Sequence, residues 1–195
     1  MKFKGTVKNA GRKPNFWGNS KNKLPEEFKE TIYHQYYSND TLYFYCDCSM
    51  DLENNMISIA CSYVQDGTVA VEGSIVYPPS DCKGKNIYGE LQAIMSGLLH
   101  FERHMYKLSK YIVIYSDVDH ITNILNSEVT FEKIPDLKEL QVKLTQSFKY
   151  KQLDNPHLNI SIKYLSNDLK TYNPFQKSAH NAARRLLQKQ VETNY

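Results

Sequence analysis

The sequence contains no hydrophobic run long enough to cross a membrane, and its first two dozen residues contain no acidic side chain. A membrane-spanning helix needs about 20 consecutive apolar residues. The N-terminal stretch MKFKGTVKNAGRKPNFWGNSKNK also lacks the apolar segment of a secretory signal. We therefore expect a cytoplasmic protein without a membrane segment, in which the four cysteines are reduced.

The cysteines also lack the spacing of a zinc site, because no Cys-x-x-Cys pair occurs. Cys46 and Cys48 alternate along one predicted strand, so both lie on the face opposite Asp47. Together with Cys61 on the next strand they could cluster around a metal. Packing in the core is the interpretation that we favour.

The absence of acids leaves the N-terminus strongly basic. Residues 1–24 carry seven of the 24 basic residues, so 17 basic and 21 acidic residues remain for 25–195, a net charge of −4. Such an arm often contacts nucleic acid, and Phe16 and Trp17 could stack on bases. A solvated tail is the alternative. The candidate phosphate contacts in the arm are Lys8, Arg12 and Lys13.

The rest of the chain has the composition of an ordinary globular domain, with 41% hydrophobic and 23% charged residues over the whole sequence. We divide it into a basic arm with a short helix, residues 1–40, and a single domain, residues 41–195. Strands are predicted at 41–49, 56–64, 68–76, 111–116 and 158–165. Helices are predicted at 25–38, 87–105, 117–125, 134–148 and 174–191, with a polar loop at 166–173.

The order of these elements predicts an α/β fold. The first three strands are joined by short turns and should form an antiparallel meander, whereas the later strands are joined through helices. A meander followed by helical crossovers requires one mixed sheet with helices on both faces.

Three acidic residues stand where elements meet one edge of this sheet. Asp47 lies within the most apolar strand, Glu90 near the start of the first long helix, and Asp117 at the end of the fourth strand. A carboxylate in a buried strand is costly unless it is paired or binds a metal. Asp117 alone could cap a helix, and Glu90 could complement a helix dipole. Together the three carboxylates could bind a hard divalent cation such as Mg²⁺.

Four motifs give the chain a resemblance to a known family. They are YCDCS, NIYGELQAIMSGL, VIYSDVDHITNIL and QKSAHNAARRLL, in this order and on the expected elements. From about residue 41 to 190 the chain resembles the ribonuclease H-like family, in its bacterial and plant reverse-transcriptase-like branch. The resemblance implies a five-stranded mixed sheet with helices on both faces.

The resemblance also implies an activity and a set of site residues. The family hydrolyses the RNA strand of RNA–DNA hybrids with two metal ions, Mg²⁺ or Mn²⁺. Asp47, Glu90 and Asp117 match three catalytic, metal-binding carboxylates. The fourth falls on His180, where the family usually has an acid. Imidazole is a poorer Mg²⁺ ligand than carboxylate and suits Mn²⁺ better, so we expect weaker metal binding and a relative preference for Mn²⁺.

Other residues could supply a further acid or bind the phosphates of a nucleic acid. Asp119 and Asp168 are possible substitute acids, and the final helix offers phosphate contacts through Lys177, Arg184 and Arg185. Helical spacing places Arg184 on the face of His180 and turns Arg185 away. A catalytically weak or inactive nucleic-acid-binding module with the same fold is the alternative function, and an interaction domain that has lost both properties is a third.

Overall fold

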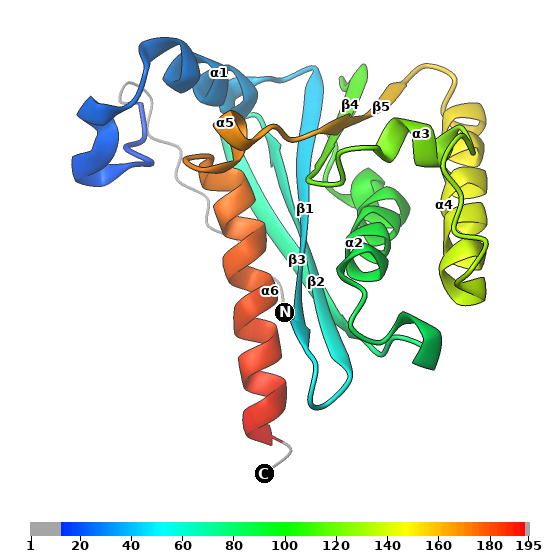
Figure 1. Ribbon diagram of the computed structural model, residues 1–195. Helices are drawn as coiled ribbons and strands as arrows, with labels where there is room; N and C mark the ends of the chain where they lie inside the picture. Colours follow the sequence, from blue (N-terminus) through cyan, green and yellow to red (C-terminus); the bar gives the residue numbers. More distant parts are fainter. Residues whose placement is uncertain (1–12, 194–195) are drawn as a thin grey trace.

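A computed structural model describes residues 13–193 and has three layers, in which helices cover both faces of one sheet (Figure 1). The five strands lie in the order β3-β2-β1-β4-β5. Their bounds are β1 Thr41–Asp51, β2 Met56–Gln65, β3 Thr68–Val76, β4 Tyr111–Ser116 and β5 Asn159–Tyr164. The predicted five-stranded mixed sheet is therefore confirmed.

Turn chemistry and crossover length fix the direction of each strand. Asp66 and Gly67 both have positive φ between β2 and β3, which suits the tight hairpin of antiparallel neighbours. The pairs β1–β4 and β4–β5 are parallel and need helical crossovers. Helix α2, Asn86–His100, precedes β4. Helices α3, Ile121–Leu125, and α4, Pro135–Asp154, precede β5.

The two faces of the sheet are covered by different helices. Helices α2 and α4 lie on one side, and α6, Pro174–Thr193, crosses the other side (Figure 1). Every residue of β2 is buried as a result. Alternation along β1 turns Cys46 and Cys48 toward α2 and turns Asp47 toward α6. The acid of the most apolar strand therefore points at the final helix.

The described part of the N-terminal region packs on the domain. It contains a 3-10 helix, Gly18–Lys23, and α1, Glu26–Tyr37. Trp17 Nε1 donates a hydrogen bond to the carbonyl oxygen of Tyr172 over 2.8 Å, and the Phe16 ring meets the Phe175 ring edge-on at 5.5 Å. The Phe16 and Trp17 rings are thus engaged within the protein, so they are not a free surface for stacking bases.

The predicted helix bounds differ from the structure in several places. The helix predicted at 117–125 begins at Ile121, and the helix predicted at 134–148 continues to Asp154. Helix α2 ends at His100 instead of continuing to residue 105, because Phe101–Arg103 tighten into a 3-10 turn. The polar stretch 166–173 is not wholly a loop, since it contains the short helix α5, Asn167–Lys170. Within residues 13–193 no helix combines the length and the apolar character needed to span a membrane.

Candidate active site

Asp47 is the most enclosed acid of the sheet, and α6 supplies partners for both of its oxygens. Only 4% of the surface of Asp47 is exposed. Gln176 Nε2 donates to Oδ1 over 3.1 Å, and His180 Nδ1 lies 2.8 Å from Oδ2. Burial raises the pKa of Asp47 to about 6, although the hydrogen bond and charge of His180 act in the opposite direction. Helix α6 therefore fixes the orientation of this carboxyl group.

Glu90 reaches the site because α2 approaches the sheet very closely. A Cβ atom on the preceding residue, Gly89, would lie 2.7 Å from Cys48 Sγ, which is closer than real Cβ atoms come. Glu90 Oε1 accepts hydrogen bonds from Cys48 Sγ, over 3.2 Å, and from Asn86 Nδ2, over 3.4 Å. Its Oε2 is buried without a hydrogen-bond partner in the protein.

Burial and neighbouring charge act together on Glu90. Desolvation, followed by the negative charges of Asp117 and Asp47, raises the pKa of Glu90 to about 9. Without a cation this carboxyl group therefore carries a proton at neutral pH. A buried acidic oxygen without a partner, beside two further carboxyl groups, is an arrangement that a bound cation would satisfy.

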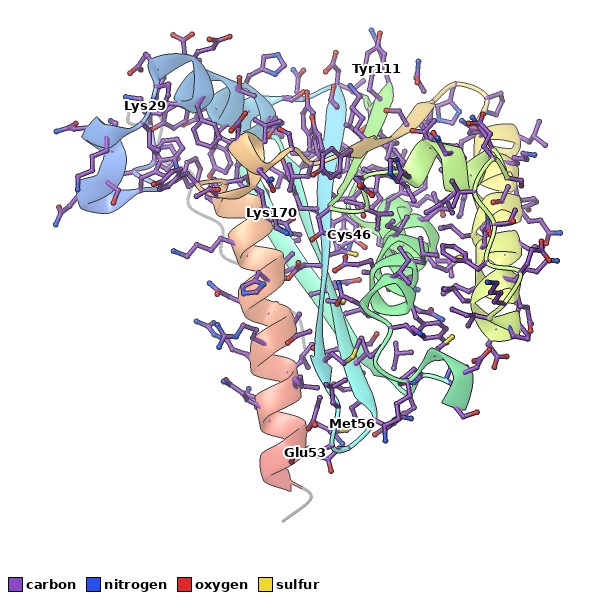
Figure 2. The ribbon with its side chains drawn as sticks, in the orientation of Figure 1. Lys29, Cys46, Glu53, Met56, Tyr111 and Lys170 are labelled. Atoms are coloured by element: carbon purple, nitrogen blue, oxygen red, sulfur yellow. The ribbon has the colours of Figure 1, made fainter. Side chains whose placement is uncertain are left out.

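Asp117 follows β4 and is paired with a lysine from α5. Lys170 Nζ lies 2.6 Å from Asp117 Oδ2, at the junction of α5 and the start of α6 (Figure 2). Burial alone would lower the pKa of Lys170. The hydrogen bond to Asp117 and the charges of Asp117, Asp47 and Glu90 outweigh that effect and leave its pKa raised. The ammonium group thus supplies positive charge beside the acids.

The three predicted carboxylates do converge. One oxygen from each of Asp47, Glu90 and Asp117 lies within 4.8 Å of the other two. Metal ions in two-metal sites lie about 3.5–4 Å apart, so oxygens at this spacing are within reach of a shared ion or pair of ions. An all-oxygen donor set suits Mg²⁺ or Mn²⁺. These residues therefore fit the metal that the family resemblance implies.

His180 lies beside this group and contacts it through Asp47 alone among the hydrogen bonds of the described residues. Its side chain is 49% exposed, so the ring also borders solvent. The substitute acids do not join the cluster. Asp119 is 67% exposed at its side chain and lies 3.5 Å from His120, and Asp168 is exposed. The position predicted for a fourth ligand is thus occupied by an imidazole that holds Asp47.

Sequence reasoning missed three residues that complete the surroundings of the acids. Gln176 stands one helical turn before His180, and this spacing could have indicated a second contact to Asp47. Cys48 was assigned to the core, although its thiol contacts Glu90. No sequence pattern indicated Lys170, because it lies in the polar stretch that was expected to be a loop.

The predicted nucleic-acid contacts are spread over several surfaces. Lys8 and Arg12 lie outside the described residues, whereas Lys13 places its ammonium group 4.8 Å from the centre of the Tyr33 ring. Lys177 and Arg184 are exposed on α6. Arg185 is exposed as well, as expected for a side chain that turns away from the sheet, and it borders a hollow between α6 and β3.

Solved structures share this architecture, at low sequence identity. No family model and no curated protein sequence matches the chain. The ribonuclease H1 of the halophilic archaeon Halobacterium salinarum is similar, with a TM-score of 0.53 and 16% identity over 74% of this chain and 98% of that one. The N-terminal RNase H domain of a Mycobacterium tuberculosis protein has a TM-score of 0.51 and 13% identity over 76% and 97%.

The chain has a ribonuclease H-like fold. A further structure with this fold is LC11-RNase H1 in complex with an RNA/DNA hybrid, which has a TM-score of 0.50 and 15% identity over 73% of this chain and 98% of that one. Nearly the whole of each matched ribonuclease H chain is covered. About a quarter of this chain lies outside each match.

Proposed function

We propose that the protein is a metal-dependent endonuclease that hydrolyses the RNA strand of RNA–DNA hybrids. The observation that carries the proposal is the convergence of Asp47, Glu90 and Asp117 from β1, α2 and β4 within a ribonuclease H-like fold. The complex of LC11-RNase H1 with an RNA/DNA hybrid supports the substrate class.

The chain's own residues would prepare this site in separate ways. Asp47, Glu90 and Asp117 would hold two Mg²⁺ or Mn²⁺ ions, which supply activation of a water molecule and neutralisation of charge on the leaving oxygen. Gln176 and His180 keep Asp47 in one orientation. Glu90 has to release its proton before it can act as an anionic ligand.

The basic side chains would bind the nucleic acid rather than take part in the chemistry. Lys177, Arg184 and Arg185 on α6 and Lys8, Arg12 and Lys13 of the arm are the proposed phosphate contacts. Ribonuclease H-like recognition of a hybrid depends on its A-form-like shape and its 2′-hydroxyl groups rather than on base sequence. Cleavage is therefore expected with little sequence preference.

A catalytically weak nucleic-acid-binding module is the second candidate. It is favoured by the contacts within the site, because both oxygens of Asp47 and one oxygen of Asp117 already have partners from the chain. His180 also leaves the cluster one carboxylate short of the four-acid pattern. Such a protein would bind hybrids without cutting them.

A cleavage assay separates the two candidates. A hybrid with a labelled RNA strand is incubated with the protein in Mg²⁺ and then in Mn²⁺, alongside the same hybrid with a labelled DNA strand. The proposed nuclease shortens only the RNA strand, and Asp47→Asn abolishes the reaction in both metals. Retention of the hybrid on the protein with both strands intact in both metals would establish the binding module instead.

A further inference from the structure

Within residues 13–193, the helices cover only part of the sheet face opposite α2. Helix α6 packs on β1, β2 and β3. On the same face, β4 presents Tyr111, Val113 and Tyr115, and β5 presents Asn159, Ser161 and Lys163. Strand register aligns these side chains in rows, with Tyr111 between Thr41 and Asn159, and Val113 between Tyr43 and Ser161. The strands therefore hold these side chains in fixed positions on the surface.

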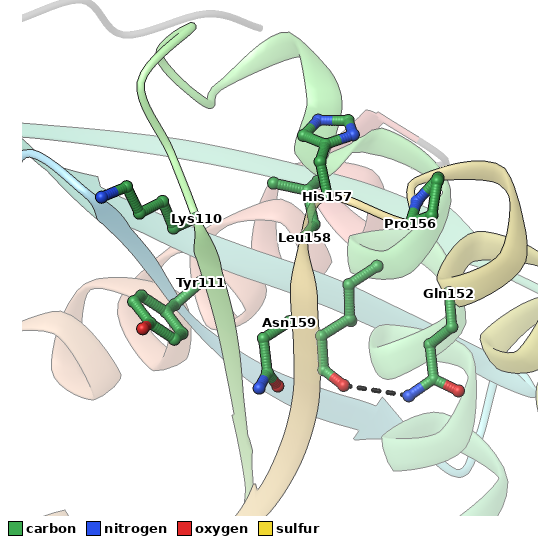
Figure 3. Close-up of a pocket in the computed structure, with 8 residues that line it drawn as sticks. Lys110, Tyr111, Gln152, Pro156, His157, Leu158 and Asn159 are labelled. Atoms are coloured by element: carbon green, nitrogen blue, oxygen red, sulfur yellow. Dashed lines mark hydrogen bonds between the residues drawn. The ribbon is translucent and has the colours of Figure 1, made fainter.

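A hollow of about 390 Å³ lies on this surface. Its lining is Thr41, Tyr43, Tyr111, Val113, Asn159, Ser161 and Lys163, and we call it the tyrosine hollow. A second hollow of about 540 Å³ shares Tyr111 and Asn159 with it and adds Lys110 and His157. Figure 3 shows Tyr111 and Asn159 side by side at the beginning of β4 and β5. The two hollows therefore adjoin at Tyr111.

Stacked aromatic rings lead into the tyrosine hollow. The Tyr45 and Tyr115 rings are stacked at 5.0 Å, and the Tyr115 and Tyr43 rings at 6.5 Å, both nearly parallel. Tyr43 is the last ring of this stack and lines the hollow, and Tyr111 on its other side is 45% exposed. A flat aromatic ring entering the hollow could continue the stack, and the Asn159 amide offers hydrogen bonds to its edge. The Ser161 hydroxyl donates to the Ile112 carbonyl oxygen over 3.4 Å, and its oxygen can still accept a hydrogen bond.

The charge of this surface favours a polyanion. Among the described residues no carboxylate lines either hollow, whereas Lys163 and Lys110 do, in a body whose net charge is −4. Asp40 precedes Thr41 in the chain. Its carboxylate accepts hydrogen bonds from the Ser38 and Thr41 hydroxyl groups and offsets part of the Lys110 charge. Lys163 forms no ion pair with any described residue.

We propose that the tyrosine hollow binds an unpaired nucleotide of a single-stranded nucleic acid. Exposed aromatic rings with flanking lysines are the combination that binds single strands without sequence preference, through stacking on bases and charge contacts to phosphates. Tyr43 and Asp47 share one face of β1, four residues apart, which places the hollow roughly 13 Å along the strand from the acid cluster. The site is distinct from that cluster and does not depend on metal.

Binding is measured by fluorescence anisotropy with the full chain in EDTA and a short labelled oligouridine. Tyr111→Ala should weaken binding on the order of tenfold, the effect of losing one stacked base. Lys163→Ala should reduce the slope of log affinity against log salt by roughly 0.7, the value for one phosphate of a single strand. Tyr77→Ala and Lys133→Ala are the matched controls, because both residues are exposed on other parts of the surface.

The proposal is overturned if Tyr111→Ala and Lys163→Ala bind the oligouridine as the two control variants do. Photo-crosslinking of an iodouridine-substituted oligonucleotide provides a readout that does not depend on substitution. The crosslinked peptides should contain Tyr43 or Tyr111, and crosslinks confined to other peptides would count against the hollow. Since no metal is present, failure of the proposed hydrolysis would leave this result unaffected.

Discussion

At the scale of single residues, the site is defined by carboxyl groups that the fold buries at a cost. Glu90 and Asp47 are each 4% exposed, and both have a raised pKa. A lone carboxyl group in the core does not stabilise the fold. Buried acidic residues are therefore expected mainly at sites that bind a ligand or catalyse a reaction. The residues around them, Gln176, His180 and Lys170, donate hydrogen bonds or carry positive charge toward the acids.

The pKa of Glu90 makes a prediction about stability. Between its ordinary value of 4.5 and about 9, the metal-free folded protein retains a proton that the unfolded chain has released. The free energy of unfolding in EDTA should therefore fall as pH rises through this range, and Asp47 adds a smaller effect of the same sign up to about pH 6. Denaturant unfolding at several pH values measures the slope. Glu90→Gln should reduce it, and equal slopes in the two proteins would contradict the assigned protonation.

The identity of His180 predicts a metal preference. His180→Asp replaces an imidazole with a hard oxygen ligand, so Mg²⁺ binding should strengthen, on the order of tenfold, relative to Mn²⁺ binding. Isothermal titration calorimetry with each metal measures both affinities. His180→Asn, which has no charge, is the control for shape. If His180→Asp and His180→Asn bind each metal with the same affinity, residue 180 is not a metal ligand. The imidazole would then contribute only its hydrogen bond to Asp47.

At the scale of elements, the position of the site depends on how closely α2 approaches the sheet. Gly89 has no room for a Cβ atom next to Cys48, and Gly97 has none next to the Phe44 ring, 2.5 Å away. Gly89→Ala and Gly97→Ala should each destabilise the fold by about 1–3 kcal/mol through overpacking. Only Gly89→Ala should also weaken Mn²⁺ binding, because it displaces the neighbouring Glu90. Equal metal affinity in the two variants would contradict this account.

Local sequence patterns predict some of these elements, whereas packing between distant residues is not visible in the sequence. Alternation and short turns predicted the meander, and the position of Asp47 in an apolar strand predicted a buried functional acid. Helix α5 was not predicted, because Asn167–Lys170 is too short to show a hydrophobic period, and Lys170 was missed with it. The approach of α2 at Gly89 depends on packing between residues distant in sequence, which periodicity does not show.

At the scale of the whole molecule, charge is divided between a basic N-terminus and an acidic body. Residues 1–12 contain Lys2, Lys4, Lys8 and Arg12. A deletion of residues 1–12 retains Phe16 and Trp17, which pack on the domain. This deletion should flatten the salt dependence of hybrid binding, since each lost phosphate contact reduces the slope by about 0.9 on a duplex. Anisotropy at increasing salt measures the slope. An unchanged slope would mean that residues 1–12 make no phosphate contacts.

The central claim is that Asp47, Glu90 and Asp117 form a metal-dependent hydrolytic site, and two aspartates two residues apart test it most directly. Asp117 belongs to the acid cluster, whereas Asp119 is exposed and outside it. Initial rates of RNA-strand cleavage in an RNA–DNA hybrid with Mn²⁺ are compared for the parent, Asp117→Asn and Asp119→Asn. We expect Asp119→Asn to cleave at the parental rate and Asp117→Asn to cleave about 10²–10³-fold more slowly, the order of effect of removing one electrostatic group from an active site. Equal rates for the two variants would contradict the claim.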